Sequence, residues 1–410
     1  MPKRNDDFFK EKKIWSEVKD ELLGCYLVPY FNKIFYTRKP ILYVDGFAGK
    51  GKFDDGKHGS PLAALECLDK SISLYQGAHP LPAASMKFIE LNHASDLNSN
   101  LPPDPNQRCE IISGNFEEQI IPILENAAKE NKRQNVFLYI DPYGVKALDA
   151  NLFDALPGIF NTAELLINLN SWGFLRMAFA LKNTEFREST DEILKDLEEY
   201  DPSTANTVDE INVIAGGDYW QSIVERYKKN QIDGYQAEKE FSYQYKLRLR
   251  QKYDYVLDMP IKLKSGHHPK YRMVYATNHP DGCIIMAENI VARTDRLVTD
   301  IQNQGQTTLF TETAENEVVS QGILTNKAKK LLAKYNEHTR LKCFLADFYN
   351  EYGAICSPSN LIGRNAILPI LESSGLVDVK RTPAVTDKGR ATSFWDWREK
   401  DKKIVEIKGA

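Results

Sequence analysis

Short apolar runs alternate with longer amphipathic stretches along the first 290 residues of the chain. Runs such as Ile41-Leu42-Tyr43-Val44 are typical of strands buried on both faces of a parallel sheet. The predicted strands are residues 41–45, 86–90, 109–115, 135–140, 164–170, 255–263 and 271–277. The last two are joined by too few residues for a parallel crossover, so they predict an antiparallel hairpin. A charged, tyrosine-rich stretch at about 175–250 predicts a helical insertion before that hairpin.

A glycine-rich turn, Asp45-Gly46-Phe47-Ala48-Gly49-Lys50-Gly51, follows the first strand. Glycines let the backbone turn sharply and approach a ligand, and ligands of open α/β sheets bind at the carboxyl ends of strands. The turn also approximates a P-loop, but Phe53 stands where that motif carries a Mg²⁺-binding hydroxyl. The turn alone therefore fits a structural turn, a P-loop or an S-adenosylmethionine (SAM) site.

Polar side chains follow the next three strands. Glu90 closes the second strand, where an acid in nucleotide-binding folds accepts hydrogen bonds from ribose hydroxyls. Asn115 follows the third strand and suits either a contact with an adenine edge or an ordinary helix N-cap. Asp141 ends the fourth strand. Because the carboxyl ends of parallel strands meet at one sheet edge, we expect these groups to lie near Asp45.

The fourth strand leads into Asp141-Pro142-Tyr143-Gly144. This tetrapeptide partly matches the (D/N/S)-P-P-(Y/F/W) motif of enzymes that methylate exocyclic amino groups of adenine or cytosine. The Asp141 carboxylate and the Pro142 carbonyl could accept hydrogen bonds from such an amino group, and Tyr143 could stack on the base, which must be unpaired or flipped out. The alternatives are a plain type I or II turn and the metal-binding acid of a P-loop enzyme.

The order of elements decides between these readings. Five strands that alternate with helices and a final hairpin are expected of a Rossmann-like, doubly wound class I SAM-dependent methyltransferase. A P-loop enzyme needs no Glu90 and does need the hydroxyl that is missing at Phe53. We therefore expect SAM as the cofactor, and no metal. The residues expected to bind SAM are Asp45, Gly46, Phe47, Ala48, Gly49, Gly51, Glu90 and Asn115.

Four segments together resemble the three-Cys-motif partner proteins, the TcmP family. They are Tyr43 to Gly51, Gly59-Ser60-Pro61-Leu62, Tyr139 to Gly144 and Tyr275-Ala276-Thr277-Asn278-His279-Pro280. The resemblance extends from the N-terminal helix to about residue 290. It implies a bacterial or phage-associated SAM-methyltransferase-like domain and a separately encoded partner of the radical-SAM type. The three cysteines belong to that partner, which agrees with the wide spacing of the six cysteines here.

Composition limits the class of protein further. Apolar residues make up 42% of the chain and charged residues 27%, which is ordinary for a soluble globular protein. No apolar run approaches the roughly 18 residues that span a bilayer, and the N-terminus lacks a secretory apolar stretch. We expect a cytoplasmic protein without a membrane partner.

The C-terminal part differs from the rest in charge. Residues 324–410 contain 16 Lys and Arg against 10 Asp and Glu, although the whole chain has a net charge of −4. Three predicted helices, a strand, a basic loop and a returning strand at 393–395 indicate a winged helix-turn-helix. In such a domain Lys380, Arg381, Lys388 and Arg390 would contact phosphates, although winged helices also bind proteins.

The sequence thus predicts a methyltransferase domain at residues 1–300, a linker at 301–323 and a winged helix at 324–410. The main hypothesis is methylation of an exocyclic amino group of a nucleic-acid base, DNA or RNA, with Asp141, Pro142 and Tyr143 as catalytic residues. The competing hypothesis is a SAM-binding but non-methylating subunit that recognises nucleic acid for the radical-SAM-type partner.

Overall fold

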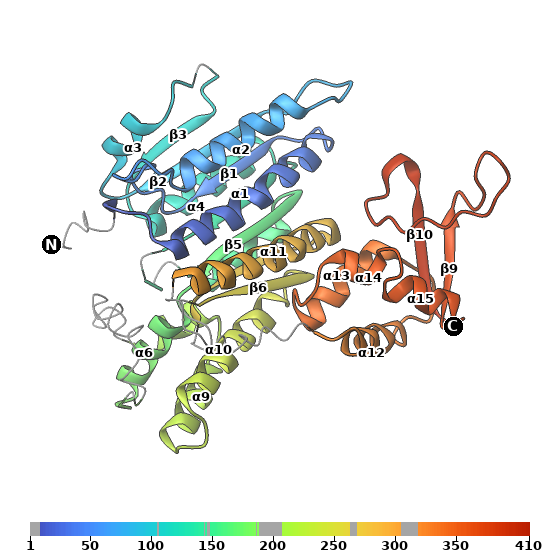
Figure 1. The fold of residues 1–410 in the computed structure, drawn as a ribbon. Helices are drawn as coiled ribbons and strands as arrows, with labels where there is room; N and C mark the ends of the chain where they lie inside the picture. Colours follow the sequence, from blue (N-terminus) through green and yellow to red (C-terminus); the bar gives the residue numbers. More distant parts are fainter. Residues whose placement is uncertain are drawn as a thin grey trace. The chain divides into compact units, whose positions relative to one another are not determined.

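The structure is a computed structural model that describes residues 9–104, 106–142, 144–145, 148–185, 187, 207–262, 269–304 and 319–410. The chain forms two compact units, Met1–Asn278 and His279–Ala410 (Figure 1). The division lies earlier than the boundary near residue 300 that the sequence suggested. The reason is helix α11 (Pro280–Gln304), which packs against helix α13 (Leu341–Tyr352) of the second unit.

The first unit is built on a seven-stranded sheet with the order β3-β2-β1-β4-β5-β7-β6. The strands are β1 (Ile41–Asp45), β2 (Ala84–Glu90), β3 (Cys109–Ser113), β4 (Asn135–Ile140), β5 (Thr162–Leu169), β6 (Tyr255–Lys262) and β7 (Pro269–Thr277). The first five run parallel, while β7 is antiparallel to both β5 and β6. This confirms the predicted Rossmann-like sheet of the class I methyltransferase type, including its terminal hairpin.

Side chains alternate between the two faces of this sheet, as the period of two in a strand requires. In β4, Val136, Leu138 and Ile140 belong to the large apolar core shared with helix α4 (Phe116–Glu130) and with the helices of the insertion. Phe137 points to the other face, where it stacks on Tyr26 of helix α1 (Ile14–Phe35). Both faces of β4 are therefore covered, which explains why residues 136–140 are apolar without a break.

Helices α1 and α2 (Ser60–Leu74) lie side by side over one face of the sheet (Figure 1). The remaining helices between the strands are α3 (Ala94–Asn100) and α5 (Ala150–Ala155), the latter continued by the 3-10 turn η2 (Leu156–Gly158). Helix α2 begins at Ser60, with Gly59 as its N-cap residue and Pro61 in its first turn. Helix α1 runs without interruption through Pro29.

The predicted helical insertion is present between β5 and β6. It consists of α6 (Ser171–Leu181), α8 (Val208–Ala215), α9 (Trp220–Lys228) and α10 (Gly234–Leu249). Several of its aromatic residues lie in the core: Phe174 stacks on Phe241 with ring centroids 4.0 Å apart, whereas Tyr243 is exposed. Residue 186 and residues 188–206 lie outside the described part of the chain.

The second unit contains α11, α12 (Gln321–Leu332), α13, α14 (Pro358–Ile362) and α15 (Ile367–Ser373), with the 3-10 turn η4 (Lys400–Lys402). Its three-stranded antiparallel sheet has the order β8-β10-β9, with β8 (Thr339–Arg340), β9 (Val377–Thr382) and β10 (Ile404–Gly409). The returning strand is therefore β10, and its prediction at 393–395 was wrong. Those three residues lie before the strand, and Phe394 and Trp395 pack near Lys403 and Arg381 instead. The winged-helix assignment itself stays a prediction, and residues 305–318 of the expected linker are not described.

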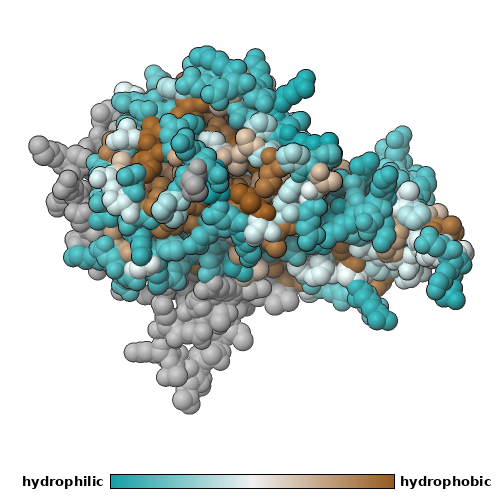
Figure 2. Space-filling view, turned by 90° about the horizontal axis from the view of Figure 1, so that it is seen from above, coloured by the Kyte–Doolittle hydropathy of each residue, from teal (hydrophilic) through white to brown (hydrophobic). Residues whose placement is uncertain are grey.

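Within the described residues, no helix is both long and apolar enough to cross a membrane. On the face of the molecule seen in Figure 2, hydrophilic residues predominate and hydrophobic ones form narrow stretches.

Candidate functional site

The turn after β1 is held by Asp45, whose side chain is fully buried. Its carboxylate accepts hydrogen bonds from the backbone amide of Phe47 (3.1 Å) and from the Ser60 hydroxyl at the start of α2 (2.6 Å). Burial raises the pKa of Asp45 to about 7, although both hydrogen bonds oppose this shift. Asp45 therefore fixes the path of the turn, and its charge titrates near neutral pH.

Two kinds of constraint explain the glycines of this turn. Gly49 and Gly51 have φ angles of +61° and +74°, which side chains rarely adopt. At Gly46 a Cβ atom would lie 2.7 Å from the Phe116 ring, and the Gly46 amide donates to the Tyr139 carbonyl (2.9 Å). The turn thus packs tightly against α4 and β4, which accounts for part of the motif without a ligand.

Glu90 braces the same turn from the end of β2. One carboxylate oxygen accepts from the Gly49 amide (2.7 Å), and the other accepts from the amides of Asn92 (2.9 Å) and His93 (3.0 Å). A carboxylate offers about four acceptor positions, so about one remains for a ribose hydroxyl. The sequence predicted the acid at this edge but not its bonds to the turn.

Asn115 caps helix α4. Its side-chain oxygen accepts from the Glu117 amide at 3.3 Å, and the residue is exposed. The N-cap alternative is thus confirmed, while a contact with adenine stays a prediction.

Asp141 lies just beyond β4 and already has three partners. The Lys19 ammonium of α1 donates to both carboxylate oxygens, at 2.8 and 2.6 Å. The Asn168 amide at the end of β5 donates at 2.6 Å, and the Tyr139 hydroxyl contributes a long bond of 3.4 Å. Pro142 is buried, whereas Tyr143 lies outside the described residues.

Lys19 and Asn168 were not predicted as site residues. Lys19 sits beside the apolar stripe of α1 and is only 6% exposed, which is unusual for a lysine. A lysine on such a stripe signals a buried partner, but nothing in the chain identifies a partner 122 residues away. Asn168 is 3% exposed. It was overlooked because in the sequence it is one residue within a predominantly apolar strand.

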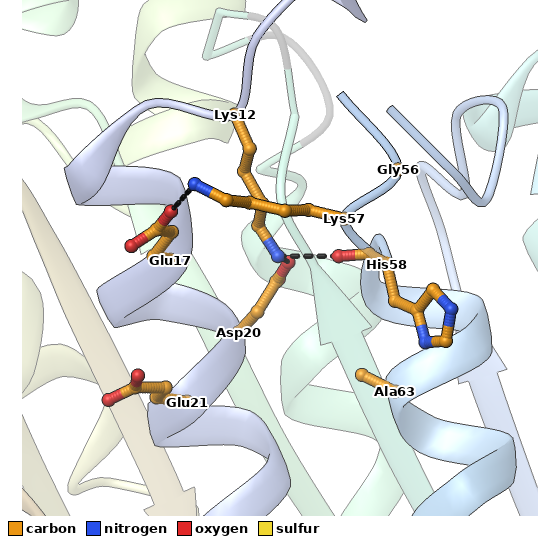
Figure 3. A pocket seen from close by; sticks show the side chains of 8 residues that line it. All are labelled: Lys12, Glu17, Asp20, Glu21, Gly56, Lys57, His58 and Ala63. Atoms are coloured by element: carbon orange, nitrogen blue, oxygen red, sulfur yellow. Dashed lines mark hydrogen bonds and ion pairs between the residues drawn. The ribbon is translucent and has the colours of Figure 1, made fainter. Parts of the chain in front are cut away.

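A polar cleft of about 560 Å³ lies between α1, the loop before α2, and α2 itself. Lys12 reaches between the Asp20 carboxylate (2.5 Å) and the His58 carbonyl (2.5 Å), and Lys57 pairs with Glu17 (Figure 3). Burial raises the pKa of Asp20, and Lys12 opposes this shift. These pairs tie the first turns of α1 to residues 56–58.

The four basic residues predicted to contact nucleic acid differ in their surroundings. Lys380, Lys388 and Arg390 are exposed, the latter two on the loop between β9 and β10. Arg381 instead pairs with both carboxylate oxygens of Glu372 (2.7 Å each) and donates to the Phe394 carbonyl (3.0 Å). Its guanidinium is thus bound within the unit.

The residues at the sheet edge fit SAM. Asp45 and Glu90 hold the turn, and its glycines with positive φ keep the backbone of the turn close to the ends of the strands. The Glu90 carboxylate also has about one acceptor position left for a ribose hydroxyl.

Comparison with known proteins adds little to this picture. No protein-family model matches the chain, and no curated protein matches it. Among solved structures, the chain is similar to a cyclopropane-fatty-acyl-phospholipid synthase-like protein from Lactobacillus casei ATCC 334, with 10% identity and a TM-score of 0.24. That match covers 64% of this chain and 92% of the other. The first unit has the strand order expected for the class I methyltransferase fold, whereas the resemblance to the TcmP family stays a prediction.

Proposed function

We propose that the chain is a SAM-dependent methyltransferase that acts on an exocyclic amino group of a nucleic-acid base. The observation that supports it is the convergence of strand ends: Asp45 and Glu90 close β1 and β2, Asp141 follows β4, and β1 pairs in parallel with both β2 and β4. Acidic side chains at the carboxyl ends of neighbouring strands can accept hydrogen bonds from the hydroxyls of a nucleoside and from an amino group.

Each side chain has a distinct role in this proposal. Bound SAM supplies an electrophilic methyl group. Asp45 and Glu90 shape the turn, and Glu90 binds the ribose. Asp141 and the Pro142 carbonyl accept hydrogen bonds from the target amino group, so that its nitrogen lone pair is held toward the methyl donor. Tyr143 would stack on the base.

One observation favours a second candidate. The partners of Asp141 leave little acceptor capacity for a target amino group, since Lys19, Asn168 and Tyr139 all donate to it. A domain that binds SAM without transferring its methyl group would need no accessible Asp141. Such a subunit would recognise nucleic acid for a separate enzyme, and the resemblance to TcmP proteins suggests a radical-SAM-type protein.

Calorimetric titration with S-adenosylhomocysteine and, separately, with ATP-Mg²⁺ tests the cofactor. Micromolar binding of S-adenosylhomocysteine alone supports the SAM site, and binding of neither ligand would make the turn structural.

Methyl transfer from labelled SAM to mixed DNA and RNA then separates the two candidates. Asp141→Ala should abolish transfer while S-adenosylhomocysteine affinity stays within about tenfold, since one tenfold step is about 1.4 kcal/mol. Asp96→Ala, an exposed acid on α3, is the control and should retain transfer. A wild-type protein that binds the cofactor product but labels no nucleic acid would favour the non-methylating subunit.

A further inference from the structure

The carboxylate of Asp141 is saturated by donors from its own chain. A carboxylate has about four acceptor positions on its two oxygens. Lys19 takes one position on each oxygen, Asn168 takes a second on Oδ1 and Tyr139 approaches Oδ2. In this arrangement a substrate amino group finds no position at Asp141 until one of these donors leaves.

The surroundings of the Lys19 ammonium suit an amine. It lies 5.4 Å from the centroid of the Tyr271 ring, a geometry typical of cation–π contacts. The Asn168 side-chain oxygen is buried and has no hydrogen-bond partner among the described residues. The orientation of that amide is fixed because its nitrogen donates to Asp141, and a flipped amide would set two oxygens against each other. An acceptor thus remains for a second hydrogen of an amino group.

Of the three donors to Asp141, Lys19 is the one that can withdraw. Asn168 and Tyr139 belong to β5 and to β4, and both are almost completely buried in the sheet. Lys19 reaches Asp141 from α1 on a flexible four-carbon stem, and a rotation of that stem frees both oxygens at once.

We propose that Lys19 is an internal occupant of the amino-group site and closes that site to substrate until its ammonium withdraws. This inference rests on the proposed function, because it concerns the same site and the same class of substrate. Methyl transfer requires a free acceptor position at Asp141, and the described arrangement has none. The proposal resolves this conflict, because the structure then represents the closed state of the site. The substrate base then places its amino group at Asp141 instead of the Lys19 ammonium, and the Asn168 oxygen is available, besides the Pro142 carbonyl, to accept its second hydrogen.

Nucleic-acid affinity in the presence of saturating S-adenosylhomocysteine tests this proposal. We would measure fluorescence anisotropy of labelled single-stranded DNA and RNA oligonucleotides that contain adenine and cytosine. Lys19→Met removes the ammonium but keeps the length of the side chain, whereas Lys19→Arg keeps the cation. Lys13→Met is the matched control, since Lys13 is the exposed N-cap residue of α1, its ammonium lies 3.4 Å from the Glu11 carboxylate, and its contacts among the described residues do not include Asp141.

Lys19→Met should bind one of the oligonucleotides roughly tenfold more tightly than wild type, because a charge-assisted internal competitor is gone. Lys19→Arg should bind like wild type. Removal of a lysine ordinarily weakens binding to a polyanion, so Lys13→Met should bind equally or less tightly. Tighter binding by Lys19→Met would distinguish the proposal from two alternatives. Loss of a positive charge in general would weaken binding, and loss of a purely structural ion pair would not strengthen it. If Lys19→Met binds neither oligonucleotide more tightly than Lys13→Met, the proposal is overturned.

A second measurement covers the case in which Lys19→Met fails to fold. In wild type, acetylation of Lys19 by acetic anhydride, followed by peptide mass spectrometry, should rise when oligonucleotide and S-adenosylhomocysteine are added together. Unchanged acetylation overturns the proposal. Failure of wild type to bind S-adenosylhomocysteine is a separate result, which overturns the proposed function instead.

Discussion

The carboxylate of Glu90, at the end of β2, accepts a 2.7 Å hydrogen bond from the backbone amide of Gly49 in the turn after β1. Two strand ends are thereby joined through one acid, which also accepts from the amides of Asn92 and His93. The residue that the sequence marked as a ribose ligand is therefore part of the framework of the turn as well. A substitution of Glu90 tests the predicted ribose contact.

Glu90→Gln should lower the affinity for S-adenosylhomocysteine by roughly tenfold or more, because bonds to a charged acceptor contribute about 1.5–3 kcal/mol. A glutamine has one acceptor oxygen and cannot serve three backbone amides and a ribose. Calorimetric titration measures the change. Glu110→Gln, an exposed acid on β3, is the control and should bind like wild type. Retention of full affinity in Glu90→Gln would contradict a role in binding.

Ser60→Ala should destabilise the first unit by about 1–3 kcal/mol, the cost of removing a donor from a buried acceptor. The Ser60 hydroxyl donates to Asp45, whose carboxylate has no access to water as a substitute. Differential scanning calorimetry of the full chain detects the lower melting temperature. Ser73→Ala lies on the same helix, where its exposed hydroxyl bonds only a helix carbonyl, and should change little. Equal melting temperatures for the two variants would show that Ser60 is dispensable.

Glu164 gives the first unit a pH-dependent stability. It is buried on β5 and accepts hydrogen bonds from the hydroxyls of Tyr26 (2.6 Å) and Tyr275 (2.9 Å). Burial raises its pKa from the usual 4.5 to about 7, against the effect of the hydrogen bonds. The folded state therefore holds this proton more tightly than the unfolded state does.

The resulting stabilisation is fully present below pH 4.5 and is lost as the pH rises to about 7. Glu164→Gln cannot titrate, so the difference in stability between wild type and variant should change by up to about 3 kcal/mol across this window and stay constant above it. Melting temperatures between pH 4.5 and 8 measure it, with Glu110→Gln as an exposed control. A pH-independent difference would mean that the Glu164 pKa is ordinary.

The fold was largely predictable because its signals are local. Wholly apolar runs such as 136–140 mark doubly covered strands, and the short connection before β7 forces an antiparallel hairpin. Helix α3 was not predicted, since Ala94–Asn100 is short and polar and only Leu97 is buried. The returning strand was misplaced because Phe394 and Trp395 were taken as its residues, whereas the strand that pairs with both β9 and β8 is Ile404–Gly409.

The site was predictable only in part, because its decisive contacts are long-range. Strand-end position identified Asp45, Glu90 and Asp141, since position along the chain determines which sheet edge they share. Their hydrogen-bond partners depend instead on how helices pack over the sheet. The pairing of Lys19 with Asp141 requires α1 to cross the end of β4, which no sequence period specifies.

Arg381 should contribute to stability rather than to nucleic-acid binding. Arg381→Ala removes a two-pronged bond to Glu372 and the bond to the Phe394 carbonyl. Since the Arg381 side chain is only 9% exposed, we expect a loss of about 1–3 kcal/mol in the second unit. Calorimetry of the full chain measures it. Lys388→Ala, on the exposed loop, is the control and should leave the melting temperature unchanged.

Lys388 and Arg390 provide the test of nucleic-acid binding by the second unit. Both are exposed on the loop between β9 and β10, and cations that contact phosphates add to affinity without regard to sequence. In the double variant Lys388→Ala/Arg390→Ala, affinity for DNA or RNA of any sequence should fall, and the slope of log K against log salt should shrink by about 1–2. Lys334→Ala removes an exposed lysine that pairs with Glu351 on α13 and should leave the slope unchanged. If the double variant keeps both affinity and slope, the loop does not contact phosphates, and a protein-binding role for this unit is favoured instead.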